Sequence, residues 1–355
     1  MKIAVFLRDL NSGGAEKMMV GFINHLCQTT SHDVYLILSR NRGPYMSMVD
    51  PKVKIVVLGK ERSIASVIPL FMYLRKNRVD VLYSTLLNAN LTSILIGKLL
   101  AIKVIIREAN TISEFKKSNR KTKDSITLSL IKYVYGFAHR CIAISNIVKS
   151  DLLNYTGLPS EKINVIYNPL VIVDDLSSAV LEDDFFHIGL VSRLSAQKNI
   201  PTIVEIIETF SHKPYKIKFH FFGEGEQVSL LNALKEKCKP SLIEIHGFQL
   251  SYYSYIKQMN LFIHLPLWEG LGNSVLEVFN AGIPMILSDI RSGYSELIDA
   301  DQPNVHYFEP TGKVRDIVNL IERYINKEIV IESNREKLKL KSSDIFQQYK
   351  ELAEC

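Results

Sequence analysis

Short apolar runs recur along this chain at the spacing of strands in a parallel sheet, and they form two successive series. The first series begins at residues 2–7 and the second at 187–191, and the runs lack the polar alternation of half-exposed strands. Helical periodicity separates most of them, for example at 64–76 and 91–100. Alternating strands and helices predict right-handed βαβ units. The fold class expected is therefore α/β, with two Rossmann-like doubly wound domains.

The boundary between the two series falls at Asn168-Pro169, followed by a mixed acidic stretch that is typical of a linker. A chain of 355 residues is long for one core and suits two domains. We expect one domain at 1–169 and a second at 170–334. Residues 335–355 have a helical pattern without a following strand, and we expect this helix to pack back on the first domain.

Charge is divided unequally between the two halves. Residues 1–175 carry a balance of +11, and the remainder carries −5. A basic first half indicates an anionic surface or substrate, although a merely solvated basic face is the alternative. The loop 113–124 places five basic residues around one phenylalanine, which suits the surface of an anionic membrane; a solvated loop remains the alternative.

Nothing in the sequence predicts export or a membrane span. Residues 3–7 are too short for a signal peptide, and the apolar region 81–106 is interrupted by polar residues. The four cysteines lack metal-site spacing, which favours a reducing compartment: Cys27, Cys141, Cys238 and Cys355. We expect a cytoplasmic protein, peripheral on the inner face of the cytoplasmic membrane.

The stretch 265–277 has the pattern of a phosphate-binding turn. It follows an apolar strand at 261–263, passes through two glycines and enters a helix at 274–281. Free backbone N–H groups and the helix dipole favour an anion at such a place. The backbone positions expected to meet a ligand there are Gly270, Leu271, Gly272, Asn273 and Ser274.

Two acids, Glu269 and Glu277, bracket this helix start. Eight helical residues span about 12 Å, which suits two hydroxyl-bearing groups on either side of a diphosphate. A carboxylate pair sharing one bond needs about 5–9.5 Å. Taken singly, each acid is more often a solvated or capping residue.

Further polar residues and glycines follow other predicted strands. Arg193 and Lys198 lie on one loop, and two cations with a helix N-terminus can neutralise a diphosphate without metal. No clustered Asp or His follows the strands, so we expect no metal and no cofactor. The remaining candidates are Gly223 and Gly225 in the second half, and Gly13, Gly14, Arg107, Glu108 and Asn110 in the first.

These residues resemble a known family. Glu269-Gly270 with Glu277, followed by Ala281-Gly282-Ile283-Pro284, resembles the Glu-x7-Glu signature of the GT-B glycosyltransferases of family 4. Arg193 with Lys198-Asn199 is similar to that family's diphosphate-binding pair. Gly223-x-Gly225 and Gly13-Gly14-Ala15-Glu16 also fit, so the resemblance covers the whole chain. Its C-terminal motifs are specific, whereas the N-terminal Gly-Gly is not.

The resemblance implies an acceptor-binding first domain and a nucleotide-sugar-binding second domain across a central cleft. It also implies metal-independent transfer with retention at the anomeric carbon. Arg193 and Lys198 would hold the diphosphate and stabilise the departing charge. Glu269 would contact sugar hydroxyls and Glu277 the ribose, while Gly13 and Gly14 would let the first domain close over the phosphates.

One position departs from the family pattern. Many members have a histidine where this chain has Arg107-Glu108, so the acceptor site is expected to differ, and Arg107, Glu108 and Asn110 are its candidates. The function expected is retaining transfer from a UDP-sugar to a glycan or polyprenyl-diphosphate-linked acceptor in bacterial lipopolysaccharide or capsule synthesis. The alternatives are a nucleotide-sugar epimerase and a non-catalytic sugar-nucleotide-binding subunit. The partners expected are these ligands and an anionic inner-membrane surface, without nucleic acid.

Overall fold

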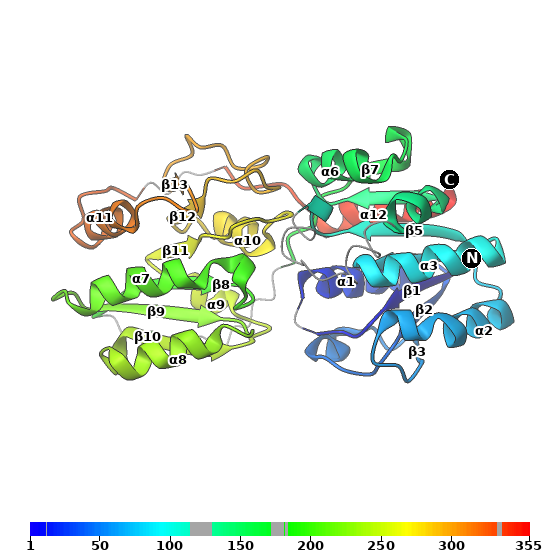
Figure 1. The fold of residues 1–355 in the computed structure, drawn as a ribbon, viewed down its shortest axis with the longest axis horizontal. Helices are drawn as coiled ribbons and strands as arrows, with labels where there is room; N and C mark the ends of the chain where they lie inside the picture. The colour runs from blue at the N-terminus through cyan, green and yellow to red at the C-terminus, as the bar shows by residue number, and fades with distance from the viewer. Residues whose placement is uncertain (12, 114–129, 172–180, 182–183, 332–335) are drawn as a thin grey trace. The chain divides into compact units, whose positions relative to one another are not determined.

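A computed structural model of the chain divides it into two compact units (Figure 1). Unit 1 comprises Met1–Val171 together with Leu340–Cys355, and unit 2 comprises Ile172–Lys339. The structure describes all residues except 12, 114–129, 172–180, 182–183 and 332–335. The expected membrane-facing loop at 113–124 and the expected linker at 170–185 therefore lie largely outside the described residues.

Unit 1 is built on a seven-stranded parallel sheet with the strand order β3-β2-β1-β4-β5-β6-β7. Its strands are β1 (Lys2–Leu7), β2 (Asp33–Leu38), β3 (Lys54–Val57), β4 (Val81–Thr85), β5 (Lys103–Glu108), β6 (Arg140–Ala143) and β7 (Ile163–Val165). The described α-helices are α1 (Gly14–Thr29), α2 (Val67–Asn77), α3 (Leu87–Leu100), α6 (Asn146–Thr156) and α12 (Ser342–Glu354). Short 3-10 helices are η1 (Pro44–Met48), η2 (Ser63–Ser66), η3 (Tyr135–Phe137) and η4 (Ser160–Lys162).

Unit 2 repeats this architecture with a six-stranded parallel sheet in the order β10-β9-β8-β11-β12-β13. Its strands are β8 (Phe186–Val191), β9 (Ile217–Phe222), β10 (Ile243–Gly247), β11 (Leu261–His264), β12 (Met285–Ser288) and β13 (Val305–Phe308). Its described helices are α7 (Ile200–Ser211), α8 (Val228–Lys237), α9 (Tyr253–Ile256), α10 (Asn273–Ala281) and α11 (Val314–Ile325), with η5 (Ala196–Lys198) and η6 (Pro240–Leu242).

Both sheets confirm the predicted fold class of two Rossmann-like α/β domains. In each sheet the strand order reverses once, between β1 and β4 in unit 1 and between β8 and β11 in unit 2. Ligands of doubly wound sheets bind at such switch points, beyond the carboxyl ends of the strands. The segments that follow β8 and β11 are therefore the ones to inspect for a binding site.

Some elements differ from their expected positions. The helix expected at 64–76 is divided into η2 and α2, and Pro69 lies in the first turn of α2, where a missing N–H is tolerated. The last strand of unit 1 forms at Ile163–Val165. After it, Asn168 turns into the unit and accepts a hydrogen bond from Arg107 Nη2 at 2.7 Å. β13 adds an edge strand to the second sheet that was not identified in the sequence, and α11 follows it.

The final helix, α12, belongs to unit 1 although the whole of unit 2 precedes it. It packs against α1 through its apolar face, with the rings of Phe22 and Tyr349 5.3 Å apart. Tyr83 in β4 donates a hydrogen bond of 2.6 Å to the carbonyl of Tyr349, and Tyr83 is 1% exposed. The end of the chain is thus part of the unit 1 core.

Candidate active site at the switch point of unit 2

Two loops meet beyond the carboxyl ends of β8 and β11. Leu267 N–H donates to the carbonyl of Gln197 at 2.9 Å, and Gln197 Nε2 donates to the carbonyl of Trp268 at 2.9 Å. These paired bonds fix η5 against the segment that precedes α10. Residues widely separated in the sequence, Lys198 and Glu269, are brought together as a result.

Lys198, Glu269 and His264 form a largely buried polar cluster between these loops. Lys198 Nζ is ion-paired with Glu269 Oε2, and the two side chains are 12% and 11% exposed. His264 Nε2, at the end of β11, lies 3.3 Å from the same oxygen, and the side chain is only 3% exposed. His264 was not identified as a site residue from the sequence. Its position as a polar residue at the end of an apolar strand was the only indication.

The protonation states within this cluster follow from burial and neighbouring charge. Burial raises the pKa of Glu269, but the Lys198 charge and the His264 contact outweigh it and hold that pKa well below its usual range. Burial and the Lys198 charge lower the pKa of His264. At neutral pH the cluster therefore contains an ammonium, a carboxylate and a neutral imidazole, and Glu269 can accept hydrogen bonds from hydroxyl groups.

Arg193 is exposed on the loop after β8. Within the described part of the chain, its side chain has no hydrogen-bond or ion-pair partner. Its positive charge, unlike that of Lys198, is therefore not paired with a carboxylate of the described residues. An anion arriving at this edge of the sheet would meet that charge first.

Gly223 and Gly225 hold the Arg193 loop by close backbone packing. A Cβ on Gly223, whose φ is +140°, would lie 1.9 Å from the Ser192 carbonyl oxygen. A Cβ on Gly225 would lie 2.2 Å from the carbonyl oxygen of Leu194, whose N–H donates to the Glu224 carbonyl at 2.9 Å. These glycines were expected to approach a ligand, and the structure gives them a second, steric reason to be glycine.

The start of α10 has the backbone geometry of an anion site. Gly272 is the N-cap with φ +80°, and it provides no side chain to cap the first N–H groups of the helix. The Ser274 hydroxyl instead donates to the Val191 carbonyl at 3.0 Å and ties the helix to β8. Leu271 is 1% exposed, and its contact with a ligand stays a prediction.

Glu277 lies one turn into α10 and is 5% exposed. The hydroxyl of Tyr252 donates a hydrogen bond to Glu277 Oε2. Tyr252 was not identified from the sequence, because nothing in its local pattern indicates a partner 25 residues away. Nearby, the rings of Phe222 and His246 stack with their centroids 4.3 Å apart at the end of β9.

The described residues contain one group with the composition of a metal site, formed by His220, Glu244 and His246 on β9 and β10. Their ligand atoms lie within 4.8 Å of one another. Lys218 Nζ lies 4.0 Å from Glu244 Oε2 and already offers that carboxylate a positive charge. The group does not include Lys198 or Glu269.

In unit 1, the expected acceptor residues Arg107 and Glu108 are buried. Arg107 is 1% exposed, and its guanidinium donates to Tyr349 Oη at 3.0 Å, to Thr85 Oγ1 at 3.1 Å and to Asn168. Arg107 was expected to contact an acceptor. Its side chain instead joins α12 to the sheet, so it is not open to a ligand.

Glu108 is likewise 5% exposed, and it accepts hydrogen bonds from Asn90 Nδ2 at 2.6 Å and from the Tyr135 hydroxyl. Burial raises the pKa of Glu108 to about 7. Its expected contact with the acceptor is therefore also replaced by an internal one. Asn110 is partly exposed, and its acceptor role stays a prediction.

The Gly13-Gly14 segment begins α1, with Gly13 as its N-cap. A Cβ on Gly13 would lie 2.1 Å from Glu16 Oε2, because the Glu16 side chain folds back over the helix start. The contact of Gly13 and Gly14 with a donor stays a prediction.

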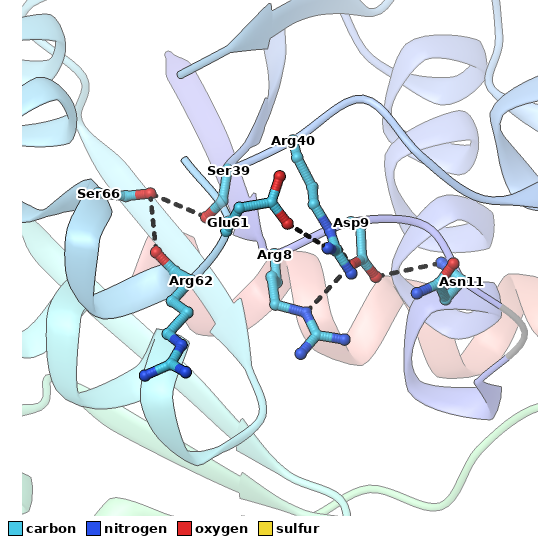
Figure 2. A network of polar contacts seen from close by, with 8 residues as sticks. All are labelled: Arg8, Asp9, Asn11, Ser39, Arg40, Glu61, Arg62 and Ser66. Carbon is cyan, nitrogen blue, oxygen red and sulfur yellow. Dashed lines mark hydrogen bonds and ion pairs between the residues drawn. The ribbon is translucent and has the colours of Figure 1, made fainter. Parts of the chain in front are cut away.

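A polar network that was not identified from the sequence supports the chain just before this segment (Figure 2). Asp9, 1% exposed, accepts from Arg8 Nε at 3.0 Å and from Arg40 Nε at 2.8 Å. Glu61 also contacts Arg40, with 2.6 Å between Glu61 Oε2 and Arg40 Nη1. The network links the carboxyl ends of β1 and β2, and the Gly13-Gly14 segment follows β1.

Comparison with known proteins matches both units to glycosyltransferase families. The family model described as "Glycosyltransferase Family 4" matches residues 12–172, and the model described as "Glycosyl transferases group 1" matches residues 175–342. Among the described helices, none is both long and apolar enough to cross a membrane.

Individual relatives and one solved structure agree with these matches. An N-acetylgalactosaminyltransferase of Campylobacter jejuni, named for an N-acetylgalactosamine-N,N'-diacetylbacillosaminyl-diphospho-undecaprenol substrate, is 24% identical over 85% of this chain and 84% of its own. The lipopolysaccharide 1,6-galactosyltransferase of Escherichia coli K12 is 27% identical over 55% of this chain, which matches only about half, 54%, of that relative's length. Anabaena HepE in complex with UDP and glucose has a similar fold, with a TM-score of 0.79, 17% identity and coverage of 99% and 98% of the two chains.

Proposed function

This chain belongs to the family 4 glycosyltransferases, and from that premise we propose that it transfers a sugar from a UDP-sugar to an acceptor in surface polysaccharide biosynthesis. The acceptor proposed is a glycan or a polyprenyl-diphosphate-linked sugar, and the transfer proceeds with retention at the anomeric carbon. The observation that carries the proposal is the buried Lys198–Glu269 pair at the switch point of unit 2.

The proposed donor site places the diphosphate between Arg193, Lys198 and the start of α10. Arg193 brings an uncompensated charge, whereas Lys198 must share its ammonium between Glu269 and the phosphate. The two cations and the helix N-terminus stabilise the negative charge that develops on the departing nucleotide. Because this positive charge comes from the protein, the proposed transfer requires no metal ion.

In this proposal Glu269 and Glu277 accept hydrogen bonds from hydroxyl groups of the donor. Glu269 is held ionised by Lys198, so it can accept hydrogen bonds from the donor sugar. Glu277 contacts the ribose, and the hydrogen bond from Tyr252 orients its carboxylate for that contact. Backbone groups from Gly270 to Ser274 complete the contacts to the sugar and phosphate.

The acceptor side of the proposal rests on unit 1 and on charge. The Campylobacter jejuni relative is named for a substrate linked to diphospho-undecaprenol, which is a lipid diphosphate. A basic first half in this chain suits such an anionic group and an anionic inner-membrane surface. Asn110, near the end of β5, is the candidate for acceptor contact that remains partly exposed.

The test measures nucleotide release from a panel of UDP-sugars, with and without lipid-linked acceptors. Lys198→Ala and Arg193→Ala should each lower kcat/KM at least about a hundredfold. Lys213→Ala is the matched control, because Lys213 forms an ion pair of 2.8 Å with Glu322 in the same unit, and its activity should equal that of the wild type. Near-normal turnover in a folded Arg193/Lys198 double variant would refute the diphosphate assignment.

The same assay separates the alternatives expected from the sequence. Nucleotide release that depends on acceptor is the result expected of a transferase. An epimerase would convert the donor without acceptor, and a binding subunit would bind the nucleotide-sugar in calorimetry without turnover. Either of those results would overturn the proposed function.

A further inference from the structure

Large apolar side chains are exposed on the helices α2 and α3 of unit 1 and on the short segments beside them. Seven of the described side chains there are between 43% and 76% exposed: Ile64, Ile68, Met72, Leu95, Leu99, Tyr133 and Phe137. Scattered exposed apolar residues need no explanation, but a contiguous group indicates an interaction surface.

These residues form stripes along neighbouring helices. Ile64, Ile68 and Met72 follow one another every four residues along η2 and α2, as do Leu95 and Leu99 along α3, so each set shares one helix face. The helices α2 and α3 pack against each other (Figure 1). The short helix η3 packs against α3. We name this surface, made by the seven residues above, the α2–α3 face.

Cations accompany the α2–α3 face. Lys98 Nζ lies 3.1 Å from the centroid of the Phe137 ring, and Arg75 and Lys76 occupy the last turn of α2 beyond Met72. Residues 62–103 include six basic residues and a single acid, Asp80. That carboxylate accepts the backbone N–H of Lys2 at 2.7 Å and is therefore already engaged within the unit.

The charge pattern decides what kind of partner fits. In a symmetric dimer the same patch meets itself, so a second copy would bring these cations opposite their own equivalents. Protein interfaces are depleted in lysine, whereas an apolar stripe edged by Lys and Arg is typical of a helix lying in the surface of an anionic bilayer. Anionic headgroups complement every cation of the face.

We propose that the α2–α3 face lies on an anionic membrane surface, with Ile68, Met72 and Leu99 entering the boundary between headgroups and acyl chains. The choice of a bilayer rests in part on the proposed function, because a polyprenyl-diphosphate acceptor is held in a membrane. The face itself is defined by the geometry of unit 1. It provides a membrane contact that does not depend on the loop at 113–124.

The experiment is flotation of the full chain with vesicles of phosphatidylcholine, with and without phosphatidylglycerol. The test variant is Ile68→Glu with Met72→Glu, at two side chains that are 76% and 61% exposed. Val330→Glu is the matched control, because Val330 is 80% exposed and lies in unit 2. A second test variant, Lys76→Gln with Lys98→Gln, removes two charges and keeps every apolar residue of the face.

The wild type and Val330→Glu should float with anionic vesicles and not with neutral ones. The double-Glu variant should bind at least about tenfold more weakly, and each lysine removed should weaken binding about fivefold. Circular dichroism and nucleotide release with a water-soluble acceptor should be unchanged in all variants. Equal flotation of the wild type and the double-Glu variant would overturn the proposal.

Two further outcomes are decisive. A wild-type dimer in light scattering that becomes a monomer in the double-Glu variant, without flotation, would identify the face as a protein interface and overturn the proposal. Flotation in the expected order with no sugar transfer from any donor would refute the proposed function and support the membrane assignment.

Discussion

Replacing Lys198 by methionine tests the charge balance of the proposed donor site. The substitution keeps most of the side-chain volume but leaves the Glu269 carboxylate, 11% exposed, beside a neutral His264. Removing one partner of a buried ion pair costs about 3–5 kcal/mol. We expect about 3 kcal/mol at pH 7.5, the low end of that range, because about a tenth of each side chain still reaches water.

The loss of unfolding free energy caused by Lys198→Met should become smaller as the pH falls. In the wild type, Glu269 has a folded-state pKa below its unfolded value, so its stabilisation is complete above about pH 4.3 and is lost only as the pH falls through the folded pKa. In Lys198→Met, burial dominates and raises the pKa of Glu269. The pKa of His264 is no longer lowered by the Lys198 charge.

The folded variant then takes up one proton on the Glu269–His264 pair that the folded wild type does not take up. Because the unfolded states of the two proteins titrate alike at these groups, the difference in unfolding free energy shrinks by about 1.4 kcal/mol for each pH unit below the raised pKa. A penalty of about 3 kcal/mol at pH 7.5 should therefore fall by at least about 1 kcal/mol at pH 5.

Urea unfolding followed by tryptophan fluorescence measures this difference. The chain has a single tryptophan, Trp268, next to Glu269, so the signal reports on unit 2. Lys213→Met is the control: Lys213 and Glu322 are 31% and 22% exposed, and we expect a cost below about 1 kcal/mol at both pH values. An equal penalty for Lys198→Met at pH 7.5 and pH 5 would refute the reasoning.

Three other substitutions examine single contacts. Gly223→Ala should destabilise unit 2 by about 2–4 kcal/mol, because its Cβ would meet the Ser192 carbonyl at 1.9 Å; an unchanged melting temperature would contradict this. Tyr252→Phe removes the hydrogen bond to Glu277 and should weaken binding of UDP-sugar about fivefold in calorimetry, so unaltered affinity would count against an orienting role. Arg107→Leu should lower the unfolding free energy by about 3 kcal/mol with an unchanged acceptor KM, whereas a raised KM at full stability would restore a direct acceptor role.

The sequence alone predicts the fold because parallel strands are buried on both faces. Runs such as 187–191 and 261–263 are apolar without alternation, and they form β8 and β11 as expected. The switch point then follows from the strand order, and with it the segments that line the candidate site. β13 was missed because Val305-His306-Tyr307-Phe308 is short and contains polar atoms, so periodicity does not separate it from a loop.

The pairing of charges could not be predicted in the same way. Lys198 and Glu269 are 71 residues apart, and nothing in either local pattern indicates that each neutralises the other. Arg107 follows a strand and has the sequence context of a ligand-binding residue. Its burial depends on Tyr349, 242 residues later in the chain, so only the tertiary structure separates a structural arginine from a functional one.

The position of α12 has a consequence for how the protein is made. Unit 1 needs Tyr349 to cover β4 and to accept the hydrogen bond from Arg107, yet the ribosome must add residues 172–339 before that helix appears. At about 5–20 residues per second, the interval from residue 171 to the end of α12 is on the order of 10–40 s. During this time the nascent first unit lacks the helix that covers apolar side chains such as Phe22. Chaperone binding to these side chains, and its release once α12 has emerged, would be the expected result during synthesis.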